Sequence, residues 1–102
     1  MKRYWVYIMT NKRHTARYVG MTTDLDLRSL KHKNGVYENA FTKKYKCSKL
    51  VWYEEQSDLE TALRQERRVK RWRREWKEQL INAMNPEWKD LSEEWHDKRD
   101  LE

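Results

Sequence analysis

The distribution of apolar and polar positions along the chain predicts three short β-strands. Residues 4–9 and 17–21 are runs of aromatic and β-branched residues, and residues 50–53 form a third run of the same kind. The polar residues 10–15 between the first two runs are few enough for a hairpin connection. The first two strands should therefore pair in antiparallel fashion.

The position of the hairpin turn decides which side chains face one another. If the turn centres near Lys12 and Arg13, Tyr7 lies opposite Tyr18 on the same face of the sheet. Two facing tyrosines are ordinary cross-strand packing unless a phosphate or a metal ion lies close to them.

A first helix is expected after the hairpin. Thr23 is a suitable N-cap residue, and Asp24 and Asp26 in the first turn favour the positive end of the helix dipole. Gly35 provides the stop, because glycine accepts the left-handed conformation that ends many helices. Residues 36–48 are polar and basic, and we interpret them as a loop.

A second helical stretch follows the third strand. Ser57 and Glu60 have the spacing of a capping box, and the pair Asn85-Pro86 ends the helical pattern. A break is expected near residues 72–74, so this stretch should form two helices.

These elements together predict an α+β domain with a small three-stranded antiparallel sheet flanked by helices, in the order β-β-α-β-α-α. We expect this domain to span residues 1–86. Residues 87–102 form an acidic tail that contains tryptophan, and it should either pack on the same domain or fray from it.

Charge is distributed unevenly along the chain. The net charge is +6, yet residues 1–85 hold 20 Lys and Arg against 10 Asp and Glu, whereas residues 86–102 hold 3 against 7. The densest basic stretch covers residues 64–77. A charge run is most often a solvated helix face, but an excess of this size beside aromatic residues favours a nucleic-acid partner.

Membrane and secretory classes are disfavoured by composition. The chain has no apolar run near 20 residues and lacks the apolar segment of a signal peptide. Its single cysteine, Cys47, excludes an internal disulfide and fits a reducing compartment, so we expect a cytoplasmic protein.

Glu66 is the most informative candidate for chemistry, because it lies on an apolar stripe of the second helical stretch. A carboxylate in such a position costs stability unless it is paired or binds a metal ion. A buried ion pair with an arginine and a functional role are equally compatible with this pattern. The stripe consists of residues that recur at steps of three and four: Leu59, Ala62, Leu63, Val69 and Trp72.

Arg28 and His32 are four residues apart on the first helix and should project from the same face. Such a basic pair is more often surface decoration than a site. Arginine is nevertheless the side chain best shaped to hold a phosphate through two parallel hydrogen bonds.

The order and spacing of these residues resemble the GIY-YIG nuclease family. Trp5-Val6-Tyr7 followed by Tyr18-Val19-Gly20 is similar to the motif pair that names the family, although the first motif has Trp for Gly and Val for Ile. Arg28, His32 and Glu66 match the family's arginine, the histidine one turn later and the metal-binding glutamate.

Three longer stretches resemble the small stand-alone bacterial branch of the family: residues 41–45, 66–76 and 85–88. The resemblance covers residues 4 to about 90. It implies a three-stranded antiparallel sheet flanked by helices, and hydrolysis of phosphodiesters in nucleic acid, with a possible place in DNA repair or processing.

The resemblance also implies roles for the site residues. Glu66 would hold one divalent ion, Mg²⁺ or Mn²⁺, and Arg28 would stabilise the negative charge of the transition state. Tyr18 would be the preferred general base, with Tyr7 orienting the water or taking that role instead. His32 would contact a phosphate or assist proton transfer.

The expected partner is nucleic acid, DNA ahead of RNA, with no membrane and no obligate protein partner. The basic residues expected to contact it lie in the loop after the first helix and in the later helices: Lys43, Lys44, Lys46, Arg67, Lys70, Arg71 and Arg74.

Two other interpretations stay open. A binding module that keeps the fold with weak or no catalysis would explain the degenerate first motif and Met21-Thr22-Thr23, where some members of the family have a lysine. A family asparagine has no certain counterpart, although Asn82 and Asn85 are candidates. A protein adaptor acting through the acidic tail would instead need an exposed apolar patch around Trp88 and Trp95.

Overall fold

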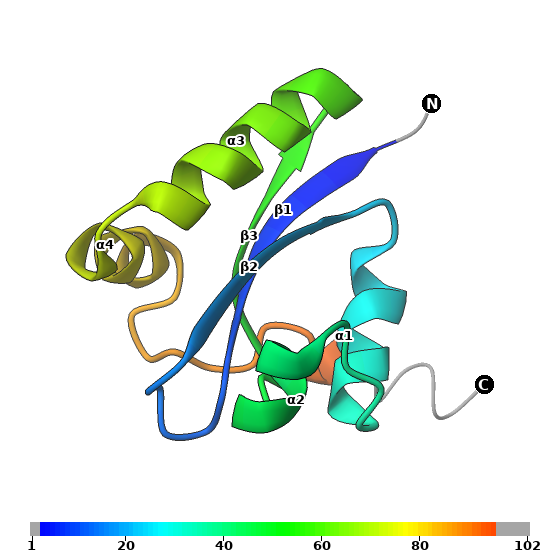
Figure 1. The fold of residues 1–102 in the computed structure, drawn as a ribbon, viewed down its shortest axis with the longest axis vertical. Helices are drawn as coiled ribbons and strands as arrows, with labels where there is room; N and C mark the ends of the chain where they lie inside the picture. Colours follow the sequence, from blue (N-terminus) through cyan, green and yellow to red (C-terminus); the bar gives the residue numbers. More distant parts are fainter. Residues whose placement is uncertain (1–2, 96–102) are drawn as a thin grey trace.

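Three antiparallel strands form the centre of the molecule, in the spatial order β2-β1-β3 (Figure 1). The computed structural model describes residues 3–95. In chain order the elements are β1 (Tyr4–Thr10), β2 (Arg17–Thr22), α1 (Leu25–Lys33), α2 (Ala40–Tyr45), β3 (Lys49–Gln56), α3 (Leu59–Arg71) and α4 (Arg74–Met84). The predicted α+β class and the three-stranded antiparallel sheet are confirmed.

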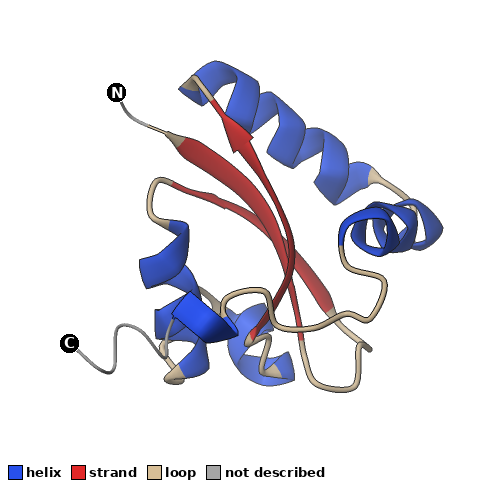
Figure 2. Cartoon of the chain, turned by 180° about the vertical axis from the view of Figure 1, so that it is seen from behind, coloured by secondary structure: helices blue, strands red, loops and turns tan. Residues whose placement is uncertain are grey.

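Helices cover both faces of the sheet, which is why the central strand β1 is almost continuously buried. From behind, α3 and α4 lie on one side of the strands and α1 and α2 on the other (Figure 2). Val6 and Ile8 pack with Val69 of α3 in one core cluster. The alternate residues Tyr7 and Met9 belong to a second cluster on the other face. No helix within residues 3–95 is long and apolar enough to cross a membrane.

The hairpin register differs from the predicted one by two residues. Tyr7 lies opposite Gly20, and Tyr18 lies opposite Met9. The loop turns one residue later than expected, because the Asn11 side chain accepts hydrogen bonds from the backbone N–H groups of its last two residues, 15 and 16. A slip of two residues keeps both tyrosines on one face, so they are diagonal neighbours.

Helix α1 begins one residue later than predicted and ends as predicted. Asp24, rather than Thr23, is the N-cap residue, and its carboxylate accepts a hydrogen bond from the Leu27 N–H at 3.0 Å. At the other end, Asn34 is the C-cap and Gly35 has φ of +84°. The shift is local, because Asp and Thr are both good N-cap residues.

Helix α2 was not predicted, since its six residues lie inside the segment that the sequence suggested was a loop. Asn39 and Thr42 form a reciprocal capping box, and Lys46 ends the helix with φ of +53°. The helix is short and basic and has too few turns to display an apolar period. The element order is therefore β-β-α-α-β-α-α.

Helix α3 is capped by Asp58 instead of Ser57, through its bond to the Thr61 N–H at 2.8 Å. The predicted break is confirmed, because α3 ends at Arg71 and α4 begins at Arg74. The apolar stripe is narrower than expected: Ala62 and Val69 are buried, but Leu59 is 46% exposed.

The first part of the acidic tail contacts the sheet. The Leu91 N–H donates a hydrogen bond to the carbonyl oxygen of Leu50 in β3 at 2.8 Å, and the Asn85 amide joins the tail to this strand by donating to the carbonyl oxygens of Val51 at 3.2 Å and Lys89 at 2.7 Å. Trp88 and Trp95 pack against the two core clusters, so neither belongs to an isolated exposed patch. Residues 96–102, the rest of the tail, lie outside the described residues.

Candidate active site

Strands β1 and β2 bring Tyr7 and Tyr18 onto the same face of the sheet. Their ring centroids are 6.4 Å apart and the ring planes are inclined by 52°. Tyr7 is fully buried, and its ring crosses the strand partner Gly20. The motif Tyr18-Val19-Gly20 therefore supplies Tyr18 to the site, and its glycine leaves the space that the Tyr7 ring occupies.

Helix α1 covers this face and supplies Arg28 and His32, one turn apart. The His32 ring is fully buried, and its Nδ1 lies 2.9 Å from the Cys47 carbonyl oxygen. Because a carbonyl only accepts, Nδ1 carries the proton in this bond. That bond fixes the ring so that Nε2 points towards the tyrosines' side of the helix, where the guanidinium of Arg28 also lies.

Glu38, which the sequence analysis did not single out, is the point where all four of these side chains meet. The Tyr7 hydroxyl donates a hydrogen bond to Glu38 Oε1, and the Tyr18 hydroxyl donates to Oε2 at 2.7 Å. Arg28 Nη1 lies 3.0 Å and His32 Nε2 lies 3.1 Å from Oε1. One carboxylate thus has two phenols and a guanidinium around it, together with an imidazole ring whose Nε2 donates when both ring nitrogens carry a proton.

This arrangement strongly favours the ionised form of Glu38. Burial by itself raises the pKa of a carboxyl, but the hydrogen bonds from His32 and the two tyrosines, with the charge of Arg28, outweigh burial and bring the pKa of Glu38 down from 4.5 to about 2. An anion at this position is therefore stabilised by every group that faces it.

The two tyrosines respond in the opposite direction. Burial, and then the hydrogen bond to Glu38 and its negative charge, raise the pKa of Tyr7 far above its ordinary value. The pKa of Tyr18 is raised by the same causes, and the charge of Glu66 raises it further. With Glu38 in place, both phenols stay protonated at neutral pH.

Glu66 reaches the site around the free edge of the sheet. Helix α3 covers the face opposite to the tyrosines, but β2 is an edge strand, so a side chain of α3 can approach Tyr18 there. Glu66 is 17% exposed and pairs with Lys70 at 2.7 Å, and Lys70 Nζ lies 5.9 Å from the centre of the Tyr18 ring. The partner of Glu66 is a lysine of its own helix and not a buried arginine.

The Glu66 carboxylate is a group at this edge that could bind a divalent ion. Within residues 3–95, no three His, Cys, Asp or Glu side chains gather in a way that could hold a metal ion. Mg²⁺ commonly binds through one or two carboxylates and keeps several waters, and the partly exposed oxygens of Glu66 fit that donor set.

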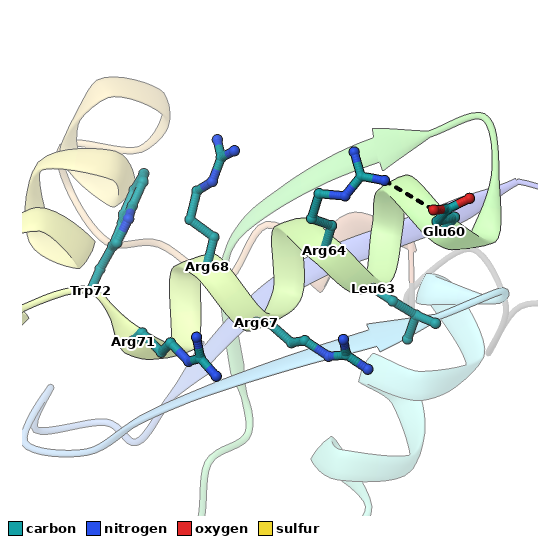
Figure 3. Close-up of a pocket in the computed structure, with 7 residues that line it drawn as sticks. All are labelled: Glu60, Leu63, Arg64, Arg67, Arg68, Arg71 and Trp72. Atoms are coloured by element: carbon teal, nitrogen blue, oxygen red, sulfur yellow. Dashed lines mark hydrogen bonds and ion pairs between the residues drawn. The ribbon is translucent and has the colours of Figure 1, made fainter.

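The outer face of α3 is a row of arginines. Arg64 and Arg68 project together with Trp72 on one side of the helix, and Arg67 and Arg71 project on the side that faces β2 (Figure 3). Of these arginines, only Arg67 and Arg71 were predicted from the sequence to contact nucleic acid. We call the four arginines with Trp72 the arginine face.

The other basic residues expected to bind nucleic acid lie apart from the arginine face. Lys43 and Lys44 belong to α2, and Lys46 is its C-cap. Arg74, at the start of α4, lies 3.4 Å from Glu78. Helices α2 and α4 share a shallow hollow, which Phe41, Tyr45, Arg74 and Lys77 line together with residues 15–17.

Comparison with known proteins decides the family. The model of the GIY-YIG catalytic domain matches residues 3–79 of this chain. The chain belongs to the GIY-YIG family. This GIY-YIG chain is also 34% identical, over 87 residues, to a UPF0213 protein of Syntrophus aciditrophicus, and the match covers 85% of this chain and 98% of that protein.

A solved relative has the same fold as this GIY-YIG domain. The solution NMR structure of a UPF0213 protein from Bacillus halodurans superposes with a TM-score of 0.53 at 29% identity, covering 88% of this chain and 94% of that one. Membership of the GIY-YIG family and the fold are thus established together.

Glu38 is the site residue that sequence reasoning missed in this GIY-YIG chain. One signal was available: Glu38 is the only Asp or Glu between Asp26 and Glu54, in a stretch rich in lysine. An acidic residue surrounded by basic residues in the sequence has many possible partners, however. Only the folded structure shows that Glu38 interacts with Arg28 and His32.

Proposed function

We propose that this protein is a metal-dependent endonuclease that hydrolyses phosphodiester bonds in nucleic acid. The observation that carries the proposal is the ring of donors formed by Tyr7, Tyr18, Arg28 and His32 around one anionic group. A phosphodiester is also an anion with two unesterified oxygens, and donors of these kinds are suited to it. Membership of the GIY-YIG family supports the same class of reaction.

In the proposed reaction, a water molecule attacks the phosphorus atom and the leaving oxygen departs on the opposite side. Arg28 is placed to stabilise the extra negative charge that develops on the phosphate oxygens. Tyr18 would first lose its own proton to solvent and then, as the phenolate, take the proton of the attacking water, and Tyr7 would orient that water. Burial, Glu38 and Glu66 raise the pKa of Tyr18, and Arg28 favours the role of base because its positive charge opposes that rise.

Glu66 would hold the divalent ion, Mg²⁺ or Mn²⁺, at the β2 edge. When bound, such an ion supplies a Lewis acid that polarises the phosphate and stabilises the leaving oxygen. Lys70 would then exchange its present pairing with Glu66 for a nearby phosphate, since lysine is a mobile point charge on a flexible stem.

The arginine face of α3 would hold the nucleic acid beyond the scissile phosphate. It runs along the outer side of the helix, so it offers several phosphate contacts in a row. Phosphate contacts carry no sequence information by themselves, and we therefore expect little sequence preference. DNA is the favoured substrate, which would suit a role in DNA repair or processing.

The direct test is incubation with labelled flap, junction, single-stranded and duplex substrates, with Mg²⁺ or Mn²⁺ and with chelator. Cleavage of at least one substrate that needs the metal ion is expected, and Arg28→Ala should reduce its rate by roughly a hundredfold to a thousandfold. Lack of cleavage across the whole panel, or cleavage that Arg28→Ala leaves unchanged, would contradict the proposal.

A second candidate function is a nucleic-acid-binding module without catalysis. It is favoured by Glu38, which keeps the phenols of Tyr7 and Tyr18 protonated in the arrangement described here. A module of this kind would bind the substrate panel with and without metal ion and cleave none of it. Binding and cleavage measured on the same samples therefore separate the two candidates.

A further inference from the structure

A carboxylate of the protein, that of Glu38, occupies the centre of the candidate active site. Glu38 lies between α1 and α2, and its carboxylate is 15% exposed. Its Oε1 atom has Tyr7, Arg28 and His32 around it, and Oε2 accepts from Tyr18. No other carboxylate within residues 27–53 could take this place.

A carboxylate and a phosphodiester present the same features to these donors. Each carries one negative charge shared by two oxygens, and each accepts hydrogen bonds from guanidinium, imidazole and phenol groups. We propose that Glu38 is an internal substitute for the scissile phosphate, and that nucleic acid must displace it to enter the site. This inference rests on the proposed function, and it assigns the position of the scissile phosphate to that of the Glu38 carboxylate.

The two anions exclude each other for electrostatic reasons. A phosphate beside an ionised Glu38 would place like charges within a few ångströms in a partly buried site, where repulsion is stronger than in water. Both would also need the same donors, because Arg28 Nη1 and His32 Nε2 already point at one oxygen of Glu38. The site therefore has room for one anion at a time.

Displacement of Glu38 leaves the rest of the fold intact. Before Glu38, the turn that ends helix α1 is held by the hydrogen bond from the Val36 N–H to the Lys31 carbonyl oxygen at 2.8 Å. After Glu38, helix α2 begins with Asn39 as its N-cap residue. The Val36 side chain is 58% exposed, so it does not hold this segment in the core. Only the short segment around Glu38 has to move, so an unoccupied and an occupied site can share one scaffold.

The exchange leaves both tyrosines hydrogen-bonded to an anion. A phosphodiester in the place of Glu38 would accept from the Tyr7 and Tyr18 hydroxyls as the carboxylate does, so Arg28 remains the group that opposes the raised pKa of Tyr18. A site closed by Glu38 is inactive until a phosphate of sufficient affinity replaces the carboxylate.

The test compares Glu38→Ala and Glu38→Gln with Glu94→Ala, which removes the same charge from an exposed position. Affinity for a short oligonucleotide is measured with chelator present, so that no cleavage is needed. If Glu38 fills the site for 90 to 99% of the time, its removal should tighten binding by about 10-fold to 100-fold. Glu94→Ala should change the affinity by less than about 2-fold.

A second measurement uses inorganic phosphate and the NMR signal of the Arg28 side-chain Nε–H group. Phosphate should shift this signal in Glu38→Ala at concentrations that leave the wild-type signal unchanged. Thermal melts of each variant show that the comparison is made on folded protein, and Glu38→Gln keeps the size of the side chain in case Glu38→Ala unfolds.

The outcomes separate this inference from the proposed function. Tighter phosphate and oligonucleotide binding without cleavage of any substrate supports the internal substitute and contradicts the nuclease. Folded Glu38 variants that bind no more tightly than wild type overturn the inference, and if they also lose an activity that wild type has, Glu38 is a catalytic group. Variants that melt at much lower temperature and gain no phosphate binding assign Glu38 a structural role and overturn the inference as well.

Discussion

Gly20 lies directly beneath the Tyr7 ring, and a Cβ atom on Gly20 would come within 2.5 Å of the Tyr7 hydroxyl oxygen and 2.9 Å of a Tyr18 ring carbon. No real Cβ contact is so short, so any larger residue at position 20 must displace one of the two tyrosines. Gly20, the last residue of the second motif, thus packs closely against Tyr7 of the first motif across the hairpin.

Gly20→Ala is therefore expected to damage the site. Tyr7 is fully buried and has no free space to retreat into, so overpacking should cost about 1–3 kcal/mol of folding free energy. Displacement of the Tyr7 hydroxyl should reduce cleavage by roughly a hundredfold. Urea unfolding and cleavage rates measure the two effects.

Gly35→Ala is the matched control. Gly35 has φ of +84° but open space around it, so alanine there should cost about 1 kcal/mol through backbone strain alone. Cleavage should stay near the wild-type rate once the protein is folded. Equal losses of activity in Gly20→Ala and Gly35→Ala would show that the contact with Tyr7 is unimportant.

Glu66→Gln tests the metal-binding role. The amide keeps the size of the side chain but loses the charge that a divalent ion needs, so cleavage should fall by about a hundredfold or more. Its present partner Lys70 is 48% exposed and can return to water, so the melting temperature should change little. Cleavage assays and thermal melts of the same sample give both numbers.

Lys70→Gln is the companion variant, because it breaks the same ion pair from the other side. If Glu66 served only in that pair, the two variants would lose equal stability and equal activity. A metal-binding Glu66 predicts a clear separation, with cleavage much lower in Glu66→Gln than in Lys70→Gln.

Salt dependence tests the arginine face of α3. If about five phosphates are contacted, the logarithm of the binding constant should fall with the logarithm of salt concentration at a slope of roughly −3.5 to −4.5. The double variant Arg64→Ala/Arg68→Ala should make the slope less steep by about 1.4 to 1.8. Lys12→Ala/Arg13→Ala removes the same charge from the exposed hairpin loop and should leave the slope nearly unchanged. Equal effects of the two double variants would contradict a defined binding face.

Glu38 should make the stability of the protein sensitive to acid. Its pKa is depressed from 4.5 to about 2 on folding, so its contribution is complete above pH 4.5 and is lost as the pH falls through about 2. For this group alone the loss is on the order of 3 kcal/mol. Urea unfolding of wild type and Glu38→Gln at pH values from 2 to 7 measures it, and the two curves should converge in acid. Parallel curves over the whole range would show that Glu38 gains nothing from its partners.

Local sequence signals were sufficient for most of the secondary structure. The three strands and the two ends of α1 were predictable because β-branched runs, Asp and Gly act over a few residues. Helix α2 was missed, since its signal is one capping box at Asn39 in a segment too short to show periodicity. The hairpin register was wrong by two residues, because the side-chain bonds of Asn11 shape the loop and the sequence pattern does not reveal them.

The sequence by itself determined the family, the strand and helix types and the identity of five candidate site residues, because motif spacing is a property of the chain. Only the tertiary structure decided that the Glu38 carboxylate occupies their centre, that Glu66 reaches Tyr18 around an edge strand, and that Gly20 must stay small. Each of these depends on groups that are distant in the chain and close in space. Burial, charge and close packing act between residues that are near in space, so the order of residues in the sequence does not reveal them.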